Sequence, residues 1–279
     1  MKITIVEGSG FCFGVQRAMD MIEKAYEDGL RFDTLGPIIH NPFVVKDLEN
    51  KGIRAVDSLD QTDKKIVVVR THGVPPQVYE EAEKKGIKLL DTTCPFVFNA
   101  QSAARRLVEE GYDPVIVVGK KEHPEVIGIL GHAWNKPVVV GSPEEVEKLN
   151  IANRRVGILS QTTMTFDLFA SCVRAAMKYA KEVHVINTRC ATTERRQKAT
   201  MEVAQKVDVM VVIGGKNSSN TKRLHEIASK YTRSYHIEHP DELKKEWFDG
   251  VENVGVAAGA STPPWLIEAV VKRIKEIGS

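Results

Sequence analysis

Three of the four cysteines follow short apolar segments and stand directly before predicted helices. Cys12 follows residues 3–6, Cys94 follows residues 88–90, and Cys190 follows residues 183–186. The N-terminal end of a helix carries a partial positive charge, which favours a thiolate over a thiol. Cys94 lies 82 residues after Cys12, and Cys190 lies 96 residues after Cys94. This spacing suggests three similar units that bring their thiolates to one centre.

Three thiolates at one centre could hold a zinc ion, an iron–sulfur cluster, or nothing. Structural zinc usually takes four ligands in closely spaced pairs, and the sequence has no such pair. A [4Fe–4S] cluster usually takes four cysteines, so three would leave one iron open to a substrate. The alternative is three buried thiols with no shared purpose. Cys172 lies inside a predicted helix, and we expect it to be a core residue.

Hydroxyl and amide side chains precede two predicted helices in the last third of the chain. Ser218, Ser219 and Asn220 stand before one helix, and Ser261 stands before another. Free N–H groups and short hydroxyls at a helix start suit an anion such as phosphate. Ordinary N-capping by Ser or Asn explains each site equally well when it is taken alone.

Three histidines follow successive apolar segments. His40 follows residues 37–39, His72 follows residues 67–71, and His123 follows residues 115–119. An imidazolium donates two charge-assisted hydrogen bonds, so the three together could neutralise a diphosphate. We interpret the other histidines as surface or packing residues: His132, His184, His225, His236 and His239.

Glu125 lies two residues after His123, at the start of a predicted helix. A carboxyl group beside a cluster and a diphosphate would lie in a strongly negative field. Such a field raises the pKa of the carboxyl group and makes it a proton donor near neutral pH. The alternative is a Glu stabilised by the helix dipole.

The elements that position these residues alternate between short apolar strands and amphipathic helices. This alternation predicts an α/β fold with mostly parallel sheets, in which ligand sites lie beyond the carboxyl ends of the strands. The predicted strands are residues 3–6, 66–70, 88–90, 115–118, 138–140, 156–159, 183–186, 209–213, 235–237 and 254–257. Predicted helices include residues 15–27, 76–85, 96–110, 166–180, 195–206, 221–230 and 264–277.

Length and charge limit the possible functions. The chain has 279 residues, enough for two or three small domains, and a net charge of +2. This balance argues against nucleic-acid binding, which needs a concentrated basic face. No apolar run reaches the length of a signal peptide or a membrane span, so we expect a cytoplasmic protein. Cysteines there are more often metal ligands, catalytic thiols or core residues than disulfides.

Nine motifs, taken in order, resemble those of the LytB/IspH family, the 4-hydroxy-3-methylbut-2-enyl diphosphate reductases. They extend from the first predicted strand to the last predicted helix. One departure is Thr192, where the family usually has Ala. The motifs are Gly10-Phe11-Cys12-Phe13-Gly14-Val15 with Arg17-Ala18, His40-Asn41, His72-Gly73, Thr93-Cys94-Pro95, His123-Pro124-Glu125-Val126, Gln161-Thr162-Thr163, Cys190 with Arg196-Gln197, Lys216-Asn217-Ser218-Ser219-Asn220, and Ala258-Gly259-Ala260-Ser261.

The resemblance implies three small α/β domains in a pseudo-threefold arrangement around a central cluster. Their expected ranges are 14–96, 97–189 and 190–279, with residues 1–13 adding a strand to the third domain. The expected cofactor is one [4Fe–4S] cluster per subunit, with three Cys ligands and one open iron site. The implied ligands are Cys12, Cys94 and Cys190.

The resemblance also implies the reaction and its partners. The substrate is an allylic diphosphate, reduced in the last step of the non-mevalonate isoprenoid pathway to isopentenyl and dimethylallyl diphosphate. Glu125 is implied as the proton donor and Thr162 as the substrate-side hydroxyl. The electron donor is of the ferredoxin or flavodoxin type, and we expect a monomer. The residues implied in diphosphate binding are His40, His72, His123, Ser218, Ser219, Asn220 and Ser261.

Two other functions remain compatible with the residues themselves. The first is a non-redox α/β protein that binds a phosphate ligand and has structural cysteines. The second is a transferase with a cysteine nucleophile, which needs one activated Cys–His pair rather than three equivalent cysteines. Iron content and a visible iron–sulfur absorption band would separate the first of these from a cluster enzyme.

Overall fold

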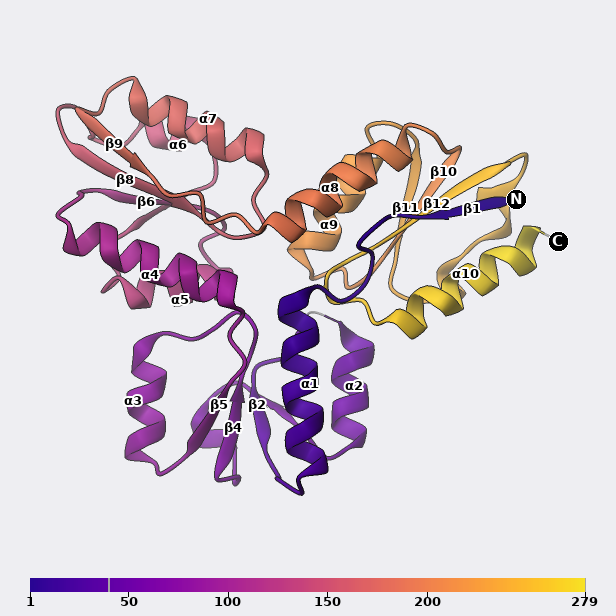
Figure 1. Ribbon diagram of the computed structural model, residues 1–279, viewed down its shortest axis with the longest axis horizontal. Helices are drawn as coiled ribbons and strands as arrows, with labels where there is room; N and C mark the ends of the chain where they lie inside the picture. The colour runs from indigo at the N-terminus through magenta and orange to yellow at the C-terminus, as the bar shows by residue number, and fades with distance from the viewer. Residues whose placement is uncertain (40, 279) are drawn as a thin grey trace. The chain divides into compact units, whose positions relative to one another are not determined.

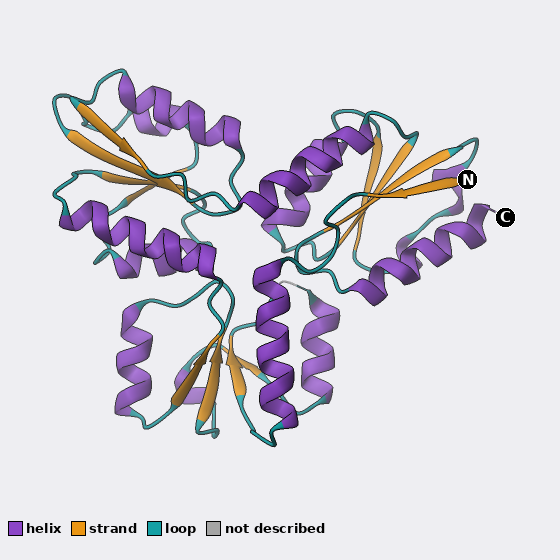
Figure 2. Cartoon of the chain, in the orientation of Figure 1, coloured by secondary structure: helices purple, strands orange, loops and turns teal. Residues whose placement is uncertain are grey.

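The computed structural model describes residues 1–39 and 41–278, which form three four-stranded parallel sheets flanked by helices (Figures 1 and 2). The predicted α/β class with parallel sheets is therefore confirmed. Sheet A has the order β1 (Lys2–Ile5), β12 (Asn253–Ala258), β10 (Val209–Ile213), β11 (Arg233–Ile237). Sheet B has the order β3 (Ala55–Val56), β2 (Asp33–Leu35), β4 (Ile66–Val69), β5 (Lys88–Asp91). Sheet C has the order β7 (Val138–Val140), β6 (Val115–Val118), β8 (Arg155–Ser160), β9 (Glu182–Val185).

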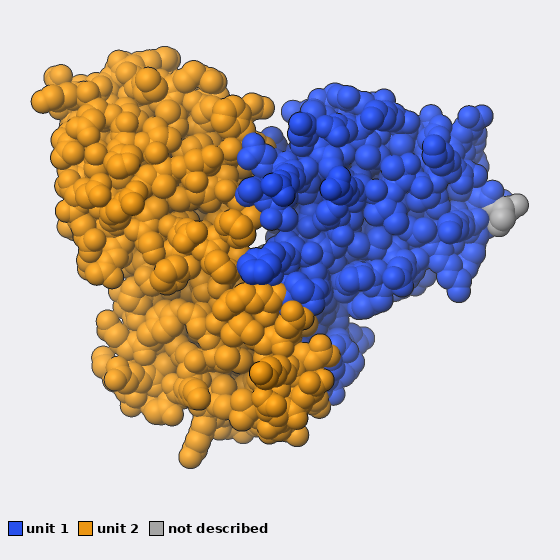
Figure 3. Space-filling view, in the orientation of Figure 1, with its two compact units in different colours: residues 1–16, 39–52, 191–279 blue, residues 17–38, 53–190 orange. Residues whose placement is uncertain are grey.

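The chain divides into two compact units, which Figure 3 colours separately. Unit 1 comprises residues 1–16, 39–52 and 191–279, and it contains sheet A. Unit 2 comprises residues 17–38 and 53–190, and it contains sheets B and C. The N-terminal strand β1 belongs to unit 1 because it pairs in parallel with β12. The three domain ranges given above stay a prediction.

Helices cover both faces of sheet A in unit 1. Side chains of β10 alternate between the faces, as a strand requires: Val209, Val211 and Ile213 face α10 (Pro264–Gly278). Met210 and Val212 pack with α8 (Ala191–Ala204) and α9 (Ser219–Ala228) on the opposite face. Both faces of the strand are apolar, which is why this segment reads as a continuous apolar run in the sequence.

Sheet C in unit 2 has the same layered construction. Val115 and Val117 pack with α4 (Pro95–Glu109) and α5 (Pro124–His132). Ile116 and Val118 pack with α6 (Pro143–Glu147) and α7 (Phe166–Met177) on the other face. Cys172 of α7 is fully buried in this second cluster, which confirms that it is a core residue.

One core cluster of sheet B includes α3 (Pro76–Lys84). The other helices are α1 (Phe13–Glu27), α2 (Pro42–Asn50), η1 (Leu59–Gln61), η2 (Pro240–Glu242) and η3 (Lys245–Phe248). None of the helices in the described part of the chain is both long and apolar enough to cross a membrane.

All ten predicted strands are present, with ends displaced by two residues at most. The apolar segments before His72 and His123 include strands, whereas the apolar segment before His40 does not. Ile38 and Ile39 are buried but lie outside any strand, and the strand here is β2, which ends at Leu35. This strand was missed because it has three residues and begins with the polar Asp33. Asp33 is buried, and its carboxylate accepts a hydrogen bond from Thr62 and forms an ion pair with Arg54.

Candidate active site

The three cysteine turns are held by equivalent backbone hydrogen bonds. The N–H of Cys12 donates to the carbonyl of Ala260 (3.2 Å), that of Cys94 to Thr71 (3.0 Å), and that of Cys190 to Thr162 (2.8 Å). In each sheet the cysteine follows an edge strand, and its acceptor follows the strand next to that edge strand. These neighbouring strands are β12, β4 and β8, respectively. Each sheet therefore presents its cysteine at the carboxyl end, immediately before a helix.

Hydroxyl groups just before each cysteine strengthen these turns. Thr92 donates to the carbonyl of Val69 (2.6 Å), and Thr188 donates to the carbonyl of Ser160 (2.5 Å). In sheet A, the Ser9 hydroxyl accepts from the N–H of Ala258 (3.1 Å). In each case the partner is the last residue of the neighbouring strand, so the hydroxyl ties the turn to the end of that strand.

The thiols fall into two classes. Cys12, Cys94 and Cys190 are half-buried, none of them in a disulfide. Cys172 is fully buried, and burial raises the pKa of its thiol to about 11. A metal ligand must be a thiolate that its metal can reach. The three turn cysteines are accessible to a metal, whereas Cys172 is not.

The cysteines of the two units must be considered separately. Cys12 belongs to unit 1, whereas Cys94 and Cys190 belong to unit 2. Within either unit, the described residues include no group of three or more His, Cys, Asp or Glu side chains arranged to hold a metal ion.

Glu125, in the first turn of α5, is a buried carboxyl group with an exposed fraction of 2 %. Burial raises its pKa to about 7, although two hydrogen bonds from Thr162 act in the opposite direction. The Thr162 N–H donates to Oε1 (2.6 Å) and its hydroxyl to Oε2 (2.8 Å). Gln161 holds the same loop, because its Oε1 accepts from the Lys120 N–H (3.2 Å). The arrangement can store and release a proton near neutral pH.

His72 and His123 lie side by side in unit 2. Their rings are 5.5 Å apart between centroids, at 73° to each other. His123 is the N-cap of α5, and its Nδ1 accepts from the Glu125 N–H (3.2 Å). We expected each imidazole to donate hydrogen bonds through both nitrogens. In His123, however, Nδ1 is an acceptor, so Nε2 is the donor. His40 lies outside the described residues.

A second polar group forms in unit 1, where β10 leads into α9. Ser218 caps α9 by accepting from the Thr221 N–H (3.3 Å). Asn220 has an exposed fraction of 4 %, and neither amide atom has a hydrogen-bond partner in the described structure. A buried amide without a partner is costly, so its donor and acceptor are available to a ligand. Ser219 is half-buried beside it, and Ser261 is buried after β12.

Close packing joins the turns that carry Ser218 and Ser261. Gly214 has φ +143°, and a Cβ there would lie 2.8 Å from the hydroxyl oxygens of both Thr221 and Thr262. A Cβ on Gly259 would lie within 3.2 Å of the Thr221 Cβ. Two glycines therefore let the Thr221 side chain enter between the turns and fix them together.

Three residues to which the sequence analysis gave no role in the site support these turns. His236 of β11 contacts the Gly214 carbonyl through Nε2 (2.8 Å), so it is a packing residue of the Ser218 loop. Arg196 donates to the carbonyl of Gly10 (2.8 Å), two residues before Cys12. Arg17 donates to the carbonyl of Thr93 (3.3 Å), just before Cys94. Arg17 and Arg196 occur in the motifs quoted above, whereas no local pattern indicates His236.

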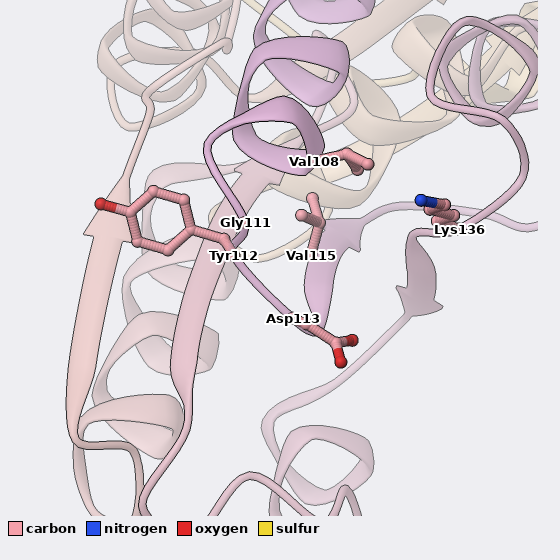
Figure 4. Close-up of a pocket in the computed structure, with 6 residues that line it drawn as sticks. All are labelled: Val108, Gly111, Tyr112, Asp113, Val115 and Lys136. Carbon is pink, nitrogen blue, oxygen red and sulfur yellow. The ribbon is translucent and has the colours of Figure 1, made fainter.

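A surface cavity of about 430 Å³ lies near the start of β6, at the end of sheet C opposite to the Cys190 and Glu125 turns (Figure 4). It contains no predicted site residue, so we do not assign it to the active site. Its lining residues are Val108, Gly111, Tyr112, Asp113, Val115 and Lys136.

The fold and these side chains define a class, the parallel α/β proteins with reactive groups at the carboxyl ends of their strands. Comparison with known proteins gives the family. The family described as LytB protein matches residues 3–275, and the chain belongs to it.

Relatives and solved structures agree with this assignment. The 4-hydroxy-3-methylbut-2-enyl diphosphate reductase of Pelobacter propionicus is 45 % identical over 278 residues, covering 99 % of both chains. A solved (E)-4-hydroxy-3-methyl-but-2-enyl diphosphate reductase, described as the terminal enzyme of the non-mevalonate pathway, is 44 % identical with a TM-score of 0.74, over 99 % of this chain and 100 % of that one. The E-1-hydroxy-2-methyl-but-2-enyl-4-diphosphate reductase from Plasmodium falciparum is 28 % identical with a TM-score of 0.91, over 97 % of this chain and 87 % of that one.

Proposed function

We propose that the chain is a 4-hydroxy-3-methylbut-2-enyl diphosphate reductase. The observation that carries this proposal is the match to the LytB family and to its named reductases over nearly the whole chain. The reaction removes the substrate hydroxyl as water with two electrons and two protons, giving isopentenyl or dimethylallyl diphosphate. It is the last step of the non-mevalonate isoprenoid pathway.

The cofactor of this proposal is one [4Fe–4S] cluster per subunit. Cys12, Cys94 and Cys190 would hold it, because they are half-buried thiols at helix starts and their backbones are fixed in equivalent turns. Three thiolate ligands leave one iron open. When bound, the cluster would pass on two electrons, one at a time, from the external electron donor and would offer a Lewis-acidic iron to the hydroxyl oxygen of the substrate.

The diphosphate would be held by two kinds of side chain. His40, His72 and His123 supply imidazole donors, and the rings of His72 and His123 already lie together. The unit 1 donors are Ser218, Ser219, Asn220 and Ser261, and the unpartnered Asn220 amide supports this role. Fixing the diphosphate fixes which end of the substrate reacts, which is a positioning effect.

Glu125 and Thr162 would deliver protons in this scheme. Glu125 has a pKa of about 7, so a large fraction carries a proton at neutral pH. Its carboxyl oxygens are both in contact with Thr162, whose hydroxyl can pass a proton between the carboxyl group and a substrate oxygen. One proton leaves with the hydroxyl as water, and the second goes to carbon at either end of the allyl group.

The remaining features of the proposal concern partners and cellular location. We assign a ferredoxin- or flavodoxin-type electron donor, a cytoplasmic location and a monomeric state. The non-redox phosphate-binding alternative is not favoured, because the named relatives are reductases over their full length.

The test is the iron content and visible spectrum of protein purified without oxygen. We expect about four irons per chain and a spectrum that the hydroxylated diphosphate perturbs. Cys94→Ser should lose iron and activity, whereas the matched control Cys172→Ser should keep both. The opposite pattern, or a well-folded protein that takes up no iron on anaerobic reconstitution, would overturn the assignment.

A further inference from the structure

Helix α5 contains two glycines that face the loop carrying His72, and Gly131 packs unusually close to this loop. A Cβ on Gly131 would lie 2.6 Å from the Cβ of Pro75 and 3.1 Å from its Cα. A Cβ on Gly128 would lie 3.7 Å from the His72 carbonyl oxygen. Glycine is a poor helix former, and α5 has only nine residues. Gly131 therefore allows the helix to pack closely against the loop, and Gly128 leaves room beside it for another side chain.

Gln101 of α4 fills the remaining space between the loop and the helix. Its exposed fraction is 2 %. Its amide nitrogen lies 3.0 Å from the Cβ position of Gly128 and 2.5 Å from that of Gly73, which has φ +71°. The Gln101 amide is thus in contact with both backbones. Movement of the loop relative to α5 would have to displace this buried side chain.

A third contact lies at the end of α5. The Nε2 of His132 is 3.2 Å from the Val74 carbonyl, two residues after His72. Helix α5 is therefore joined to the loop at Gly128, Gly131 and His132, along its last two turns. Its first residues hold His123 and Glu125 at the other end.

We propose that Gly128, Gly131 and Gln101 are positioning residues that set the spacing of the His72 and His123 rings for one phosphate of the substrate. The inference rests on the proposed function, which makes these histidines diphosphate ligands. The two histidines come from different sheets: His72 follows β4 of sheet B, and His123 follows β6 of sheet C. Their ring separation of 5.5 Å therefore depends on how α5 contacts the loop. The positioning residues themselves do not touch the substrate.

The test uses the holoenzyme and inorganic pyrophosphate as the probe. Gly131→Ala adds a methyl group that must push α5 away from Pro75. We expect the dissociation constant of pyrophosphate to rise about tenfold, and the KM of the substrate to rise in parallel, because a misplacement of about 1 Å can cost about 100-fold. The matched control is Gly141→Ala in the same unit, where the nearest atom to the new Cβ is 3.7 Å away. The control should bind pyrophosphate like the wild type.

A rescue experiment separates positioning from general damage. Pro75→Gly removes the Cβ and Cγ that the new methyl group meets, so Gly131→Ala with Pro75→Gly should recover most of the lost affinity. Iron content should stay constant in all variants. If Gly131→Ala does not fold, Gln101→Ala removes the neighbouring contact between α5 and the loop without a clash and should weaken pyrophosphate binding severalfold.

The outcomes distinguish this inference from the proposed function. Wild-type affinity for pyrophosphate in a folded Gly131→Ala or Gln101→Ala variant would overturn the positioning role. Reduced affinity that the Pro75→Gly change fails to restore would also overturn it. Absence of pyrophosphate binding by the wild-type holoenzyme would instead contradict the diphosphate assignment.

Discussion

At the scale of single residues, Glu125 shows how burial and hydrogen bonding compete. Removal from water favours the neutral carboxyl group, whereas the two donors of Thr162 favour the carboxylate. Burial has the larger effect, so the pKa rises from 4.5 to about 7. The sequence predicted a raised pKa but attributed it to the negative field of a cluster and a diphosphate. The folded chain achieves it through desolvation.

A change of Glu125 to Gln should alter the pH dependence of stability. Because folding raises the pKa, the folded protein holds this proton more tightly than the unfolded chain. This proton therefore stabilises the folded protein fully below about pH 4.5, and the stabilisation is lost as the pH rises to about 7. Urea unfolding of both proteins should show Glu125→Gln gaining up to about 3 kcal/mol relative to the wild type between pH 4.5 and 8.

Exposed Glu122→Gln is the control for the change of charge in this experiment. A constant difference in unfolding free energy between wild type and Glu125→Gln across this pH range would show that the carboxyl group is not buried as described. The Glu125→Gln variant should keep its iron and its affinity for pyrophosphate but lose most of its turnover. Unimpaired turnover would remove Glu125 from the role of proton donor.

How far single residues could be predicted depends on where their partners lie in the sequence. Cys12, Cys94 and Cys190 were found from local patterns, because each sits where a strand meets a helix. The bond from Thr162 to Glu125 spans 37 residues and that from Arg196 to Gly10 spans 186. Such contacts have no local signature. Only the resemblance to a family drew attention to Arg196, whereas the position of Glu125 just after His123 already indicated that residue.

At the scale of elements, the strand–turn–helix unit positions the chemistry. Glycines allow adjacent turns to approach each other, as Gly214 and Gly259 do around Thr221. Strands with two apolar faces were predicted correctly, because burial on both sides produces a continuous apolar run. β2 was missed, because a buried ion pair with Arg54 stabilises Asp33 where apolar packing would be expected.

Gly214→Ala should destabilise the loop that carries Ser218 and Asn220. At φ +143° a side chain is strained, and the new Cβ would also meet the Thr221 and Thr262 hydroxyls. We expect a loss of about 2 kcal/mol in unfolding free energy and weaker pyrophosphate binding. Gly8→Ala is the control, since Gly8 also has a positive φ but open space around its Cβ position. Equal losses in the two variants would show that close packing at Gly214 is unimportant.

At the scale of the whole molecule, the three sheets share one plan. In each sheet the cysteine follows an edge strand, and the next strand inward ends in the loop that fixes the cysteine. The regular cysteine spacing predicted three similar units. The spacing could not predict how the chain separates into compact units, because that division depends on contacts between side chains far apart in sequence.

The anchoring of β1 can be tested through Ile3. This side chain packs against the core of sheet A, whereas Ile5 in the same strand is 51 % exposed. Ile3→Asp should lower the unfolding free energy by about 2 kcal/mol or more and release β1. We expect the iron content to fall, because Cys12 would no longer be held in place. Ile5→Asp is the control and should keep its iron.

Unit 2 should remain intact in the Ile3→Asp variant, because Glu125 and Thr162 contact each other within that unit. Titration of Glu125, followed by the infrared band of its carboxyl group, should therefore keep its midpoint near pH 7. A normal iron content in Ile3→Asp would show that β1 is not needed to present Cys12.

The pairing of β1 with β12 also has a consequence for biosynthesis. The hydrogen bonds that tie the Cys94 and Cys190 turns to their neighbouring strands join residues 23 and 28 positions apart, whereas the bond from Ala258 to Ser9 joins residues 249 apart. Proteins emerge from the ribosome N-terminus first. Cys12 is thus the first of the three to be synthesised and the last to be fixed in place. Under the proposed assignment of the three cysteines as cluster ligands, we expect the cofactor to be inserted only after translation has passed β12.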